Sequence, residues 1–153
     1  MPERHAPQPG DETRLSRTIA ECDVNAFAAL TGDFAPAHMD SALMGRSIFG
    51  QRIVHGAMLV GLMSAASTEV AGRFGLGDGA EILVSLGYDR LRFTAPVFIG
   101  ETVTVHYRVI EADAIRQRYR ADVTVTNAQG KTVASAINIL AWSKGQPGTA
   151  TLP

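Results

Sequence analysis

An aspartate and a histidine that can transfer protons lie five positions apart in the N-terminal half of the chain. Asp33 follows Gly32 and His38 follows a Pro-Ala step, within the stretch Phe27-Ala-Ala-Leu-Thr-Gly-Asp-Phe-Ala-Pro-Ala-His-Met-Asp40. A carboxylate and an imidazole on one rigid loop can hold and deprotonate one water molecule. Taken singly, Asp33 is more simply explained as a turn residue and His38 as a structural loop histidine.

Residues 53–58, Ile-Val-His-Gly-Ala-Met, lead into a long apolar segment that is predicted to be a helix from Gly56 to Phe74. Because the first N–H groups of a helix have no partner inside it, the N–H of Gly56 can bind a carbonyl oxygen; tight packing is the alternative role for this glycine. His55 is expected to shape the start of the helix rather than to move protons. With the aspartate and the histidine, these are the parts needed to add or remove water next to a carbonyl.

The remaining elements are predicted from hydrophobic periodicity and from the positions of glycine and proline. The expected N-terminal elements are a short strand at Leu15–Ile19, a helix capped by Asp23 and ended by Gly32, a mostly irregular stretch at 33–54, and one helical turn at Ser41–Met44 within it. After residue 81 the pattern alternates, and its phase flips near Gly87 as a β-bulge would require. The expected strands cover residues 82–93, 103–109, 119–125 and 133–142, joined as an antiparallel meander.

The helix predicted at residues 56–74 carries only two charged side chains, Glu69 and Arg73. A helix this poor in charge is expected to be surrounded by other parts of the protein. The sequence therefore predicts an α+β fold in which a bent antiparallel sheet wraps around a long central helix. Such a sheet leaves one edge open and one side of the helix only partly covered, so dimerisation through edge strands is expected.

Length and composition are those of one globular domain. With 153 residues, of which 46% are hydrophobic and 19% charged, the chain is expected to form a single domain at residues 13–143 between flexible tails at 1–12 and 144–153. The net charge of −1 argues against nucleic-acid binding. The only cysteine, Cys22, is interpreted as a small buried hydrophobic residue and fits a reducing cytoplasm. No signal peptide or membrane-spanning segment is recognised.

Several other kinds of site are not supported by the sequence. His5 and His106 have no cysteine or acid at metal-ligand spacing, so no metal site is expected. A Gly-x-Ser-x-Gly motif is absent, and the glycines at 72–79 do not follow a phosphate-binding pattern. Asp40 is interpreted as a cap or turn residue for the segment after it.

Three stretches of the chain resemble the MaoC-like (R)-specific enoyl-CoA hydratases, a family with the hot-dog fold. They are the stretch from Phe27 to Asp40 quoted above, Phe49-Gly-Gln-Arg-Ile-Val-His-Gly56, and Tyr88-Asp-Arg-Leu-Arg-Phe-Thr-Ala-Pro-Val-Phe-Ile-Gly-Glu-Thr102. With the helix between them, the resemblance covers roughly residues 15–142. One departure is Ala35, which stands where the family usually has an asparagine.

The resemblance implies a role for each of several residues. Asp33 and His38 would be the catalytic pair, the N–H of Gly56 would polarise a thioester carbonyl, and Ser64 would support the site. The residues expected to contact the substrate are His55, Met58 and Phe49.

The resemblance also predicts the reaction: reversible (R)-specific hydration of a trans-2-enoyl-CoA, or of the acyl-carrier-protein thioester, to the (R)-3-hydroxyacyl thioester. We expect a cytoplasmic homodimer or trimer of dimers, with no cofactor or metal and no nucleic-acid or membrane partner. Two alternatives stay open at this point. One is an acyl-CoA thioesterase of the same fold, and the other is a non-catalytic acyl-thioester-binding subunit, which the alanine at position 35 would fit.

Overall fold

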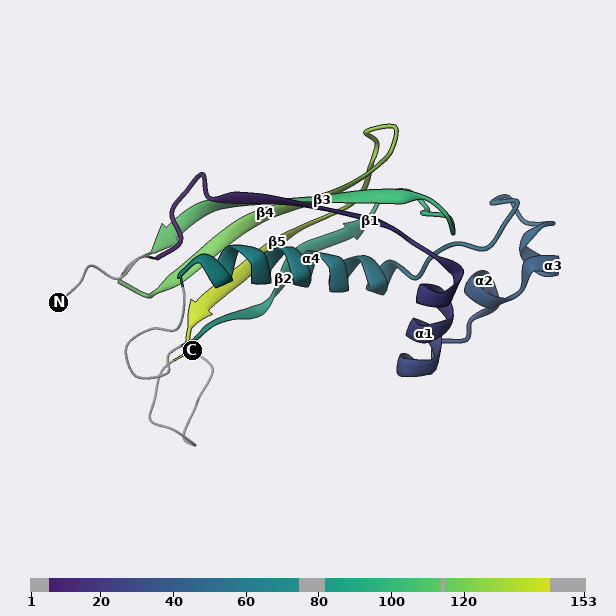
Figure 1. Cartoon of the computed structure of the whole chain (residues 1–153), viewed down its shortest axis with the longest axis horizontal. Helices are drawn as coiled ribbons and strands as arrows, with labels where there is room; N and C mark the ends of the chain where they lie inside the picture. Colours follow the sequence, from purple (N-terminus) through teal and green to yellow (C-terminus); the bar gives the residue numbers. More distant parts are fainter. Residues whose placement is uncertain (1–5, 75–81, 114, 144–153) are drawn as a thin grey trace.

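The computed structural model describes residues 6–74, 82–113 and 115–143. In these residues the chain forms five strands, four α-helices and one short 3-10 helix. The elements in chain order are β1 (Glu12–Thr18), α1 (Glu21–Thr31), α2 (Pro36–Met39), α3 (Ser41–Met44), α4 (Gly56–Ala71), η1 (Gly72–Phe74), β2 (Leu83–Phe93), β3 (Thr102–Asp113), β4 (Arg118–Asn127) and β5 (Thr132–Trp142). The bent sheet lies along one side of α4, and the short helices lie beyond the N-terminal end of α4 (Figure 1).

All five strands form one antiparallel sheet in the order β1-β3-β4-β5-β2. The expected meander is confirmed for β3, β4 and β5, but its extension to β2 is wrong. Both edges of β3 are already taken, one by β1 and the other by β4, so β2 pairs with β5 instead. The connection from β2 to β3 is anchored where the N–H of Val54 donates to the carbonyl of Val97 at 2.7 Å. Within the described sheet, β2 is therefore an edge strand.

A β-bulge near Gly87 bends this edge strand, as the flip in the alternation predicts. The register of β2 on β5 shifts between Ser85 and Gly87, and Gly87 has φ +149°, which a residue with a side chain rarely adopts. The fully buried amide of Asn138 stabilises the bulge by donating to the hydroxyl of Ser85 at 2.7 Å and to the carbonyl of Gly87 at 2.9 Å. Asn138 also accepts a 2.7 Å bond from the hydroxyl of Tyr107. Burial raises the pKa of that tyrosine.

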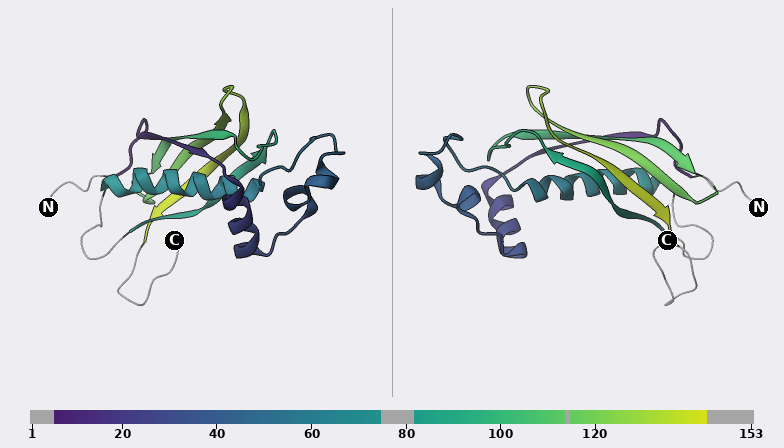
Figure 2. Two further views of the ribbon diagram at one scale, coloured as in Figure 1. Left: turned by 45° about the vertical axis from the view of Figure 1, so that its right-hand side comes forward. Right: turned by 180° about the vertical axis from the view of Figure 1, so that it is seen from behind.

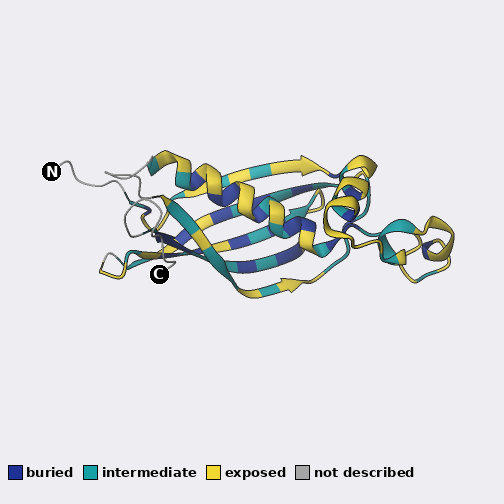
Figure 3. Ribbon diagram, turned by 90° about the horizontal axis from the view of Figure 1, so that it is seen from below, coloured by how far each residue is buried: buried dark blue, intermediate teal, exposed yellow. Residues whose placement is uncertain are grey.

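Helix α4 packs on the concave face of the sheet, and the two further views agree on this (Figure 2). Its buried positions are Met58, Leu59, Met63, Ala66, Ser67 and Val70. Its exposed positions also recur at helical spacing and form one face: Ala57, Gly61, Ser64, Ala65, Thr68 and Glu69. The prediction of a helix surrounded on all sides is wrong for the single chain, because this small-residue face is uncovered (Figure 3). The prediction of one partly covered side of the helix is confirmed.

The N-terminal helices agree only in part with the sequence predictions. Gly32 ends α1 in the left-handed region, at φ +78°, with its N–H donating to the carbonyl of Ala28. Asp23 is not the N-cap: α1 begins two residues earlier, and the Asp23 carboxylate accepts the N–H of Ala20 at 2.8 Å. Asp40 caps α3 as expected, accepting the N–H of Leu43 at 2.8 Å.

The segment before β1 pairs with the sheet, and the cysteine differs from expectation. At the end of the predicted tail, the N–H of Gly10 donates to the carbonyl of Val109, and the carbonyl of Asp11 accepts the N–H of Val109. These bonds continue the pairing that β1 makes with β3. Cys22 is exposed rather than buried, since it lies on the outer side of the first turn of α1. The predicted C-terminal tail and most of the glycine-rich segment 72–79 fall outside the described residues. No helix in the described part of the chain is long and apolar enough to cross a bilayer.

Candidate active site

The segment that carries Asp33 is fixed by hydrogen bonds at the end of α1. The hydroxyl of Thr31 donates to the carbonyl of Phe27 at 2.7 Å and accepts the N–H of Asp33 at 3.2 Å. One carboxylate oxygen of Asp33 then accepts the N–H of Ala35 at 3.3 Å. The backbone N–H of Ala35 thus helps to hold the loop, although the alanine side chain itself offers no hydrogen bond. The Asp33 side chain stays 47% exposed and can meet a ligand from solution.

His38 lies on α2, a helix that the sequence did not predict. Pro36 is its first residue, and the proline ring fixes the backbone angle φ near the value that a helix requires. The Nδ1 of His38 bonds the carbonyl of Ile53 at 2.8 Å, and the N–H of Ile53 donates to the carbonyl of Ala37 at 3.0 Å. A carbonyl can only accept, so Nδ1 carries the proton. In the neutral ring, Nε2 then keeps a lone pair, which is the group that a general base requires.

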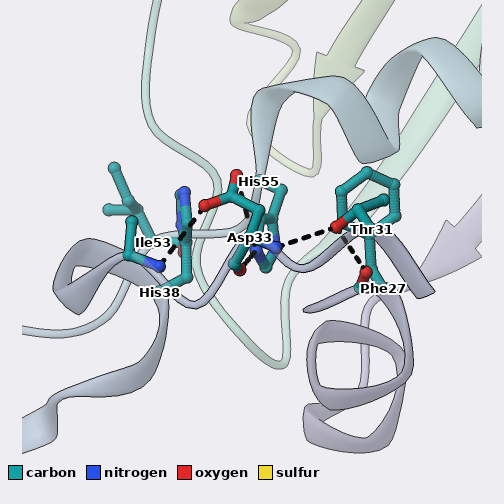
Figure 4. Close-up of polar contacts among 7 residues, drawn as sticks. Phe27, Thr31, Asp33, His38, Ile53 and His55 are labelled. Carbon is teal, nitrogen blue, oxygen red and sulfur yellow. Dashed lines mark hydrogen bonds and ion pairs between the residues drawn. The ribbon is translucent and has the colours of Figure 1, made fainter. Parts of the chain in front are cut away.

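His55 lies behind both residues and is 1% exposed. Its Nε2 lies 2.9 Å from the carbonyl oxygen of Asp33, and its ring stacks on that of His38 with centroids 3.8 Å apart (Figure 4). The ring of Phe27 covers it from the side of α1, at 4.8 Å. His55 therefore contacts both members of the predicted pair. Its burial places it beneath the loop rather than on an open surface.

The structure brings the predicted acid and base together. One ligand atom each of Asp33, His38 and His55 lie within 4.8 Å of one another. Two hydrogen bonds of about 2.8 Å each can span such a separation through a single water molecule. The arrangement can thus hold a water between a carboxylate, which orients it, and an imidazole nitrogen, which removes its proton.

The same three side chains carry atoms of the kinds that bind metal ions. Two histidines and a carboxylate are a donor set that transition metals accept. The Nε2 of His55, however, is occupied by its bond to the Asp33 carbonyl, and its Nδ1 is buried. Only Asp33 and His38 remain free to coordinate an ion, which is fewer ligands than a protein metal site normally supplies.

Gly56 begins α4 directly after His55, so its N–H points out of the first helical turn. A Cβ at this position would lie 2.8 Å from the ring of Phe93 on β2. Only glycine therefore lets the start of α4 lie this close to the ring in its present position. The Phe93 ring is 50% exposed, and it forms one wall beside the helix start.

The remaining predicted site residues lie elsewhere. Ser64 is two turns along α4, about 12 Å from Gly56 at 1.5 Å per residue, and lines a cavity of about 420 Å³ between α4 and β2. Burial raises the pKa of the nearby Tyr88, and the hydroxyls of Ser85 and Ser64 oppose that rise. Met58 lines a different cavity, of about 410 Å³, beside α1 and β1. Phe49 lies in the segment between α3 and α4 and is 38% exposed.

Sequence reasoning missed the groups that orient the pair. The carbonyl of Ile53 is a backbone group, and no residue type in the sequence marks it. Phe27 has the spacing of an ordinary apolar helix residue. Thr31 lies four residues after Phe27 on α1, and its hydroxyl bond to that carbonyl is the common pattern for threonine in a last helical turn. Of these groups, only Thr31 could have been predicted from the sequence, because it directly precedes Gly32, which ends the helix.

Comparison with known proteins places the chain among enzymes named hydratases and dehydratases. It is 37% identical over 108 residues to the (R)-specific enoyl-CoA hydratase of Aeromonas caviae, covering 71% of this chain and 72% of that protein. It is 39% identical over 119 residues to the 3-hydroxybutyryl-CoA dehydratase of Methylorubrum extorquens, covering 78% of this chain and 69% of that protein. Protein MaoC of Klebsiella aerogenes is 41% identical over 99 residues, or 64% of this chain, but the match spans only 28% of that longer protein.

The fold and the family agree with these relatives. The solved structure of the (R)-hydratase from A. caviae involved in PHA biosynthesis has a TM-score of 0.77 and 28% sequence identity, with 88% of this chain and 96% of that chain covered. This likeness confirms the predicted hot-dog fold. The MaoC like domain matches residues 4–131. The chain therefore belongs to the MaoC-like domain family.

Proposed function

We propose that this protein hydrates trans-2-enoyl thioesters to (R)-3-hydroxyacyl thioesters, and catalyses the reverse dehydration, with Asp33 and His38 acting on one water molecule. The observation that carries the proposal is the pairing of a carboxylate and an imidazole within 4.8 Å near the start of α4. The (R) configuration and the enoyl-CoA substrate come from the names of the relatives.

In the proposed reaction the water oxygen bonds to C3 of the substrate. Nε2 of His38 removes one proton from the water, while the carboxylate of Asp33 accepts the other hydrogen in a hydrogen bond and so orients it. The electron pair of the C2–C3 double bond moves toward the thioester, and the N–H of Gly56 binds the oxygen that gains charge. The proton then passes from His38 to C2. The balance is one water added, and no redox cofactor or metal takes part.

We propose that the acyl chain lies between α4 and β2. These elements run so that Phe93 lies beside Gly56 at one end and the cavity lined by Ser64 lies farther along. With a thioester carbonyl at Gly56, an acyl chain that followed α4 would reach the cavity at Ser64. This supports an acyl thioester as the substrate class, with Ser64 contacting the chain rather than the reacting carbons.

The test is incubation of the purified protein with crotonyl-CoA. We expect loss of the enoyl absorbance, no release of free thiol, and (R)-3-hydroxybutyryl-CoA as the product in chiral analysis. Thiol release from saturated acyl-CoA would instead establish a thioesterase. Binding of enoyl-CoA without turnover, across a panel of acyl lengths, would establish a non-catalytic subunit.

We also propose a homodimer, alone or as part of a trimer of dimers, acting in the cytoplasm. The open edge of β2 in the described sheet and the exposed face of α4, on which Glu69 is the one charged residue, support an interface with a second copy. The exposed thiol of Cys22 is consistent with a reducing compartment. Size-exclusion chromatography with light scattering measures the assembly, and a monomer would contradict this part of the proposal.

A further inference from the structure

We propose that His55 is a positioning residue: held as its Nε2–H tautomer, it fixes the distance between Asp33 and His38 by bonding the backbone of the first and stacking on the ring of the second. This inference rests on the proposed function for its catalytic consequence. Its structural part stands on the contacts of His55 alone.

The tautomer follows from the partner of each ring nitrogen. Nε2 lies 2.9 Å from the carbonyl oxygen of Asp33, which can only accept, so Nε2 carries a proton. Nδ1 is buried and has no hydrogen-bond partner among the described residues. A second proton on Nδ1 would be buried without an acceptor, which is a costly arrangement. His55 therefore donates through Nε2.

The two contacts of His55 meet the pair from different sides. Its bond to the carbonyl of Asp33 holds the backbone from which the carboxylate projects, while that carboxylate lies 4.0 Å from Nε2, too far for a hydrogen bond. Its ring stacks on the ring of His38 with an angle of 29° between the two planes. This contact fixes the plane of the His38 ring, and the lone pair of His38 Nε2 lies in that plane. One rigid side chain thus connects Asp33 in the loop after α1 with His38 on α2.

The backbone on either side of His55 makes this support rigid. Ile53, two residues earlier, holds His38 through its carbonyl, and Gly56, one residue later, begins α4. Phe27 closes the remaining side of the imidazole. His55 therefore has little freedom to move independently of the base, the acid or the proposed oxyanion donor.

Two substitutions separate the donor from the ring. His55→Gln places an amide N–H near the position of Nε2 and keeps the partner of the Asp33 carbonyl. His55→Phe keeps a flat ring to stack on His38 but leaves that carbonyl unpaired. A displacement of about 1 Å at a reacting group can lower the rate on the order of 100-fold. We therefore expect His55→Phe to lower kcat for crotonyl-CoA about 100-fold and to change KM less than about threefold. His55→Gln should recover kcat to within about tenfold of the wild type.

The matched control is His106→Gln, which changes a half-exposed strand histidine that bonds Glu12 outside the site. Its kcat should equal that of the wild type. The positioning role is overturned if a folded His55→Phe protein keeps kcat within about threefold, or if the two His55 variants lose kcat equally. A rise in KM alone would overturn it as well, because that result would indicate substrate contact instead.

A measurement without turnover separates this inference from the proposed function. Long-range ¹H–¹⁵N NMR of the wild-type protein reports which imidazole nitrogen carries the proton. We expect the Nε2–H form for His55 and the Nδ1–H form for His38. A His55 protonated at Nδ1 overturns the inference even if hydratase activity is found. Absence of hydratase activity with the expected tautomers overturns the proposed function and leaves the positioning of Asp33 and His38 by His55 supported. If His55→Phe does not fold, the glutamine variant and the tautomer decide the outcome.

Discussion

The two nitrogens of His38 have different roles in this account, and a pair of amide substitutions can separate them. Nδ1 donates to the carbonyl of Ile53 at 2.8 Å, so it holds α2 in place, while Nε2 is assigned to the water. In His38→Asn the amide nitrogen lies near the position of Nδ1 and keeps the bond to Ile53. In His38→Gln the amide lies near the position of Nε2, and the bond to Ile53 is lost. Neither amide can accept a proton from water.

The expected magnitudes differ between stability and activity. One partly buried neutral hydrogen bond contributes about 1 kcal/mol to stability, so His38→Gln should unfold about 1 kcal/mol more easily than His38→Asn. Loss of a general base costs on the order of 10²–10⁴-fold in rate, which is about 2.7–5.5 kcal/mol at the barrier. Both variants should therefore lose hydration activity to that extent, although only His38→Gln loses stability.

The assay combines urea unfolding with initial rates on crotonyl-CoA. Equal stabilities for the two variants would show that the bond from Nδ1 to Ile53 does not hold α2. Retention of more than a tenth of the wild-type kcat by His38→Asn would refute the assignment of Nε2 as the base, because that variant keeps the loop and removes only the chemical group.

Two further predictions concern the scaffold. Asn138→Leu should destabilise the protein by about 2–5 kcal/mol in chemical denaturation, because it removes the partner of the buried Tyr107 hydroxyl and of the part-buried Gly87 carbonyl. Adding Tyr107→Phe should recover part of the loss, and no recovery would argue against the network. The N–H of Ala20, and after it Arg17, lower the pKa of Asp23. When folding lowers the pKa of a carboxyl group, the group stabilises the protein at pH values above its pKa in the unfolded chain. This stabilisation is lost as the pH falls through its pKa in the folded protein. Asp23→Ala should thus cost up to about 1 kcal/mol at pH 7 and less at pH 2, whereas an equal cost at both pH values would contradict the assignment.

Elements with strong local signals could be predicted from the sequence. Gly32 ended the first helix because no side chain obstructs its left-handed conformation, and the phase flip marked the bulge because alternation has a strict period of two. The proximity of Asp33 and His38 followed from their short separation in the sequence.

What failed depended on partners distant in the sequence. The neighbour of β2 is set by β1 occupying an edge of β3, and a single strand carries no mark of its place in a sheet. The one-turn helix α2 is too short for periodicity, and its stability comes from Ile53, fifteen residues after His38. The exposure of Cys22 depends on which face of α1 packs inward, and a weakly amphipathic helix does not reveal this.

The most direct test of the account is kcat/KM for crotonyl-CoA hydration by Asp33→Asn relative to the wild type. Asparagine keeps an oxygen that can accept the N–H of Ala35, so the loop should remain folded while the charge that orients the water is removed. The account predicts a loss of at least about 100-fold with an unchanged unfolding free energy. A folded Asp33→Asn protein with kcat/KM within about tenfold of the wild type would contradict it.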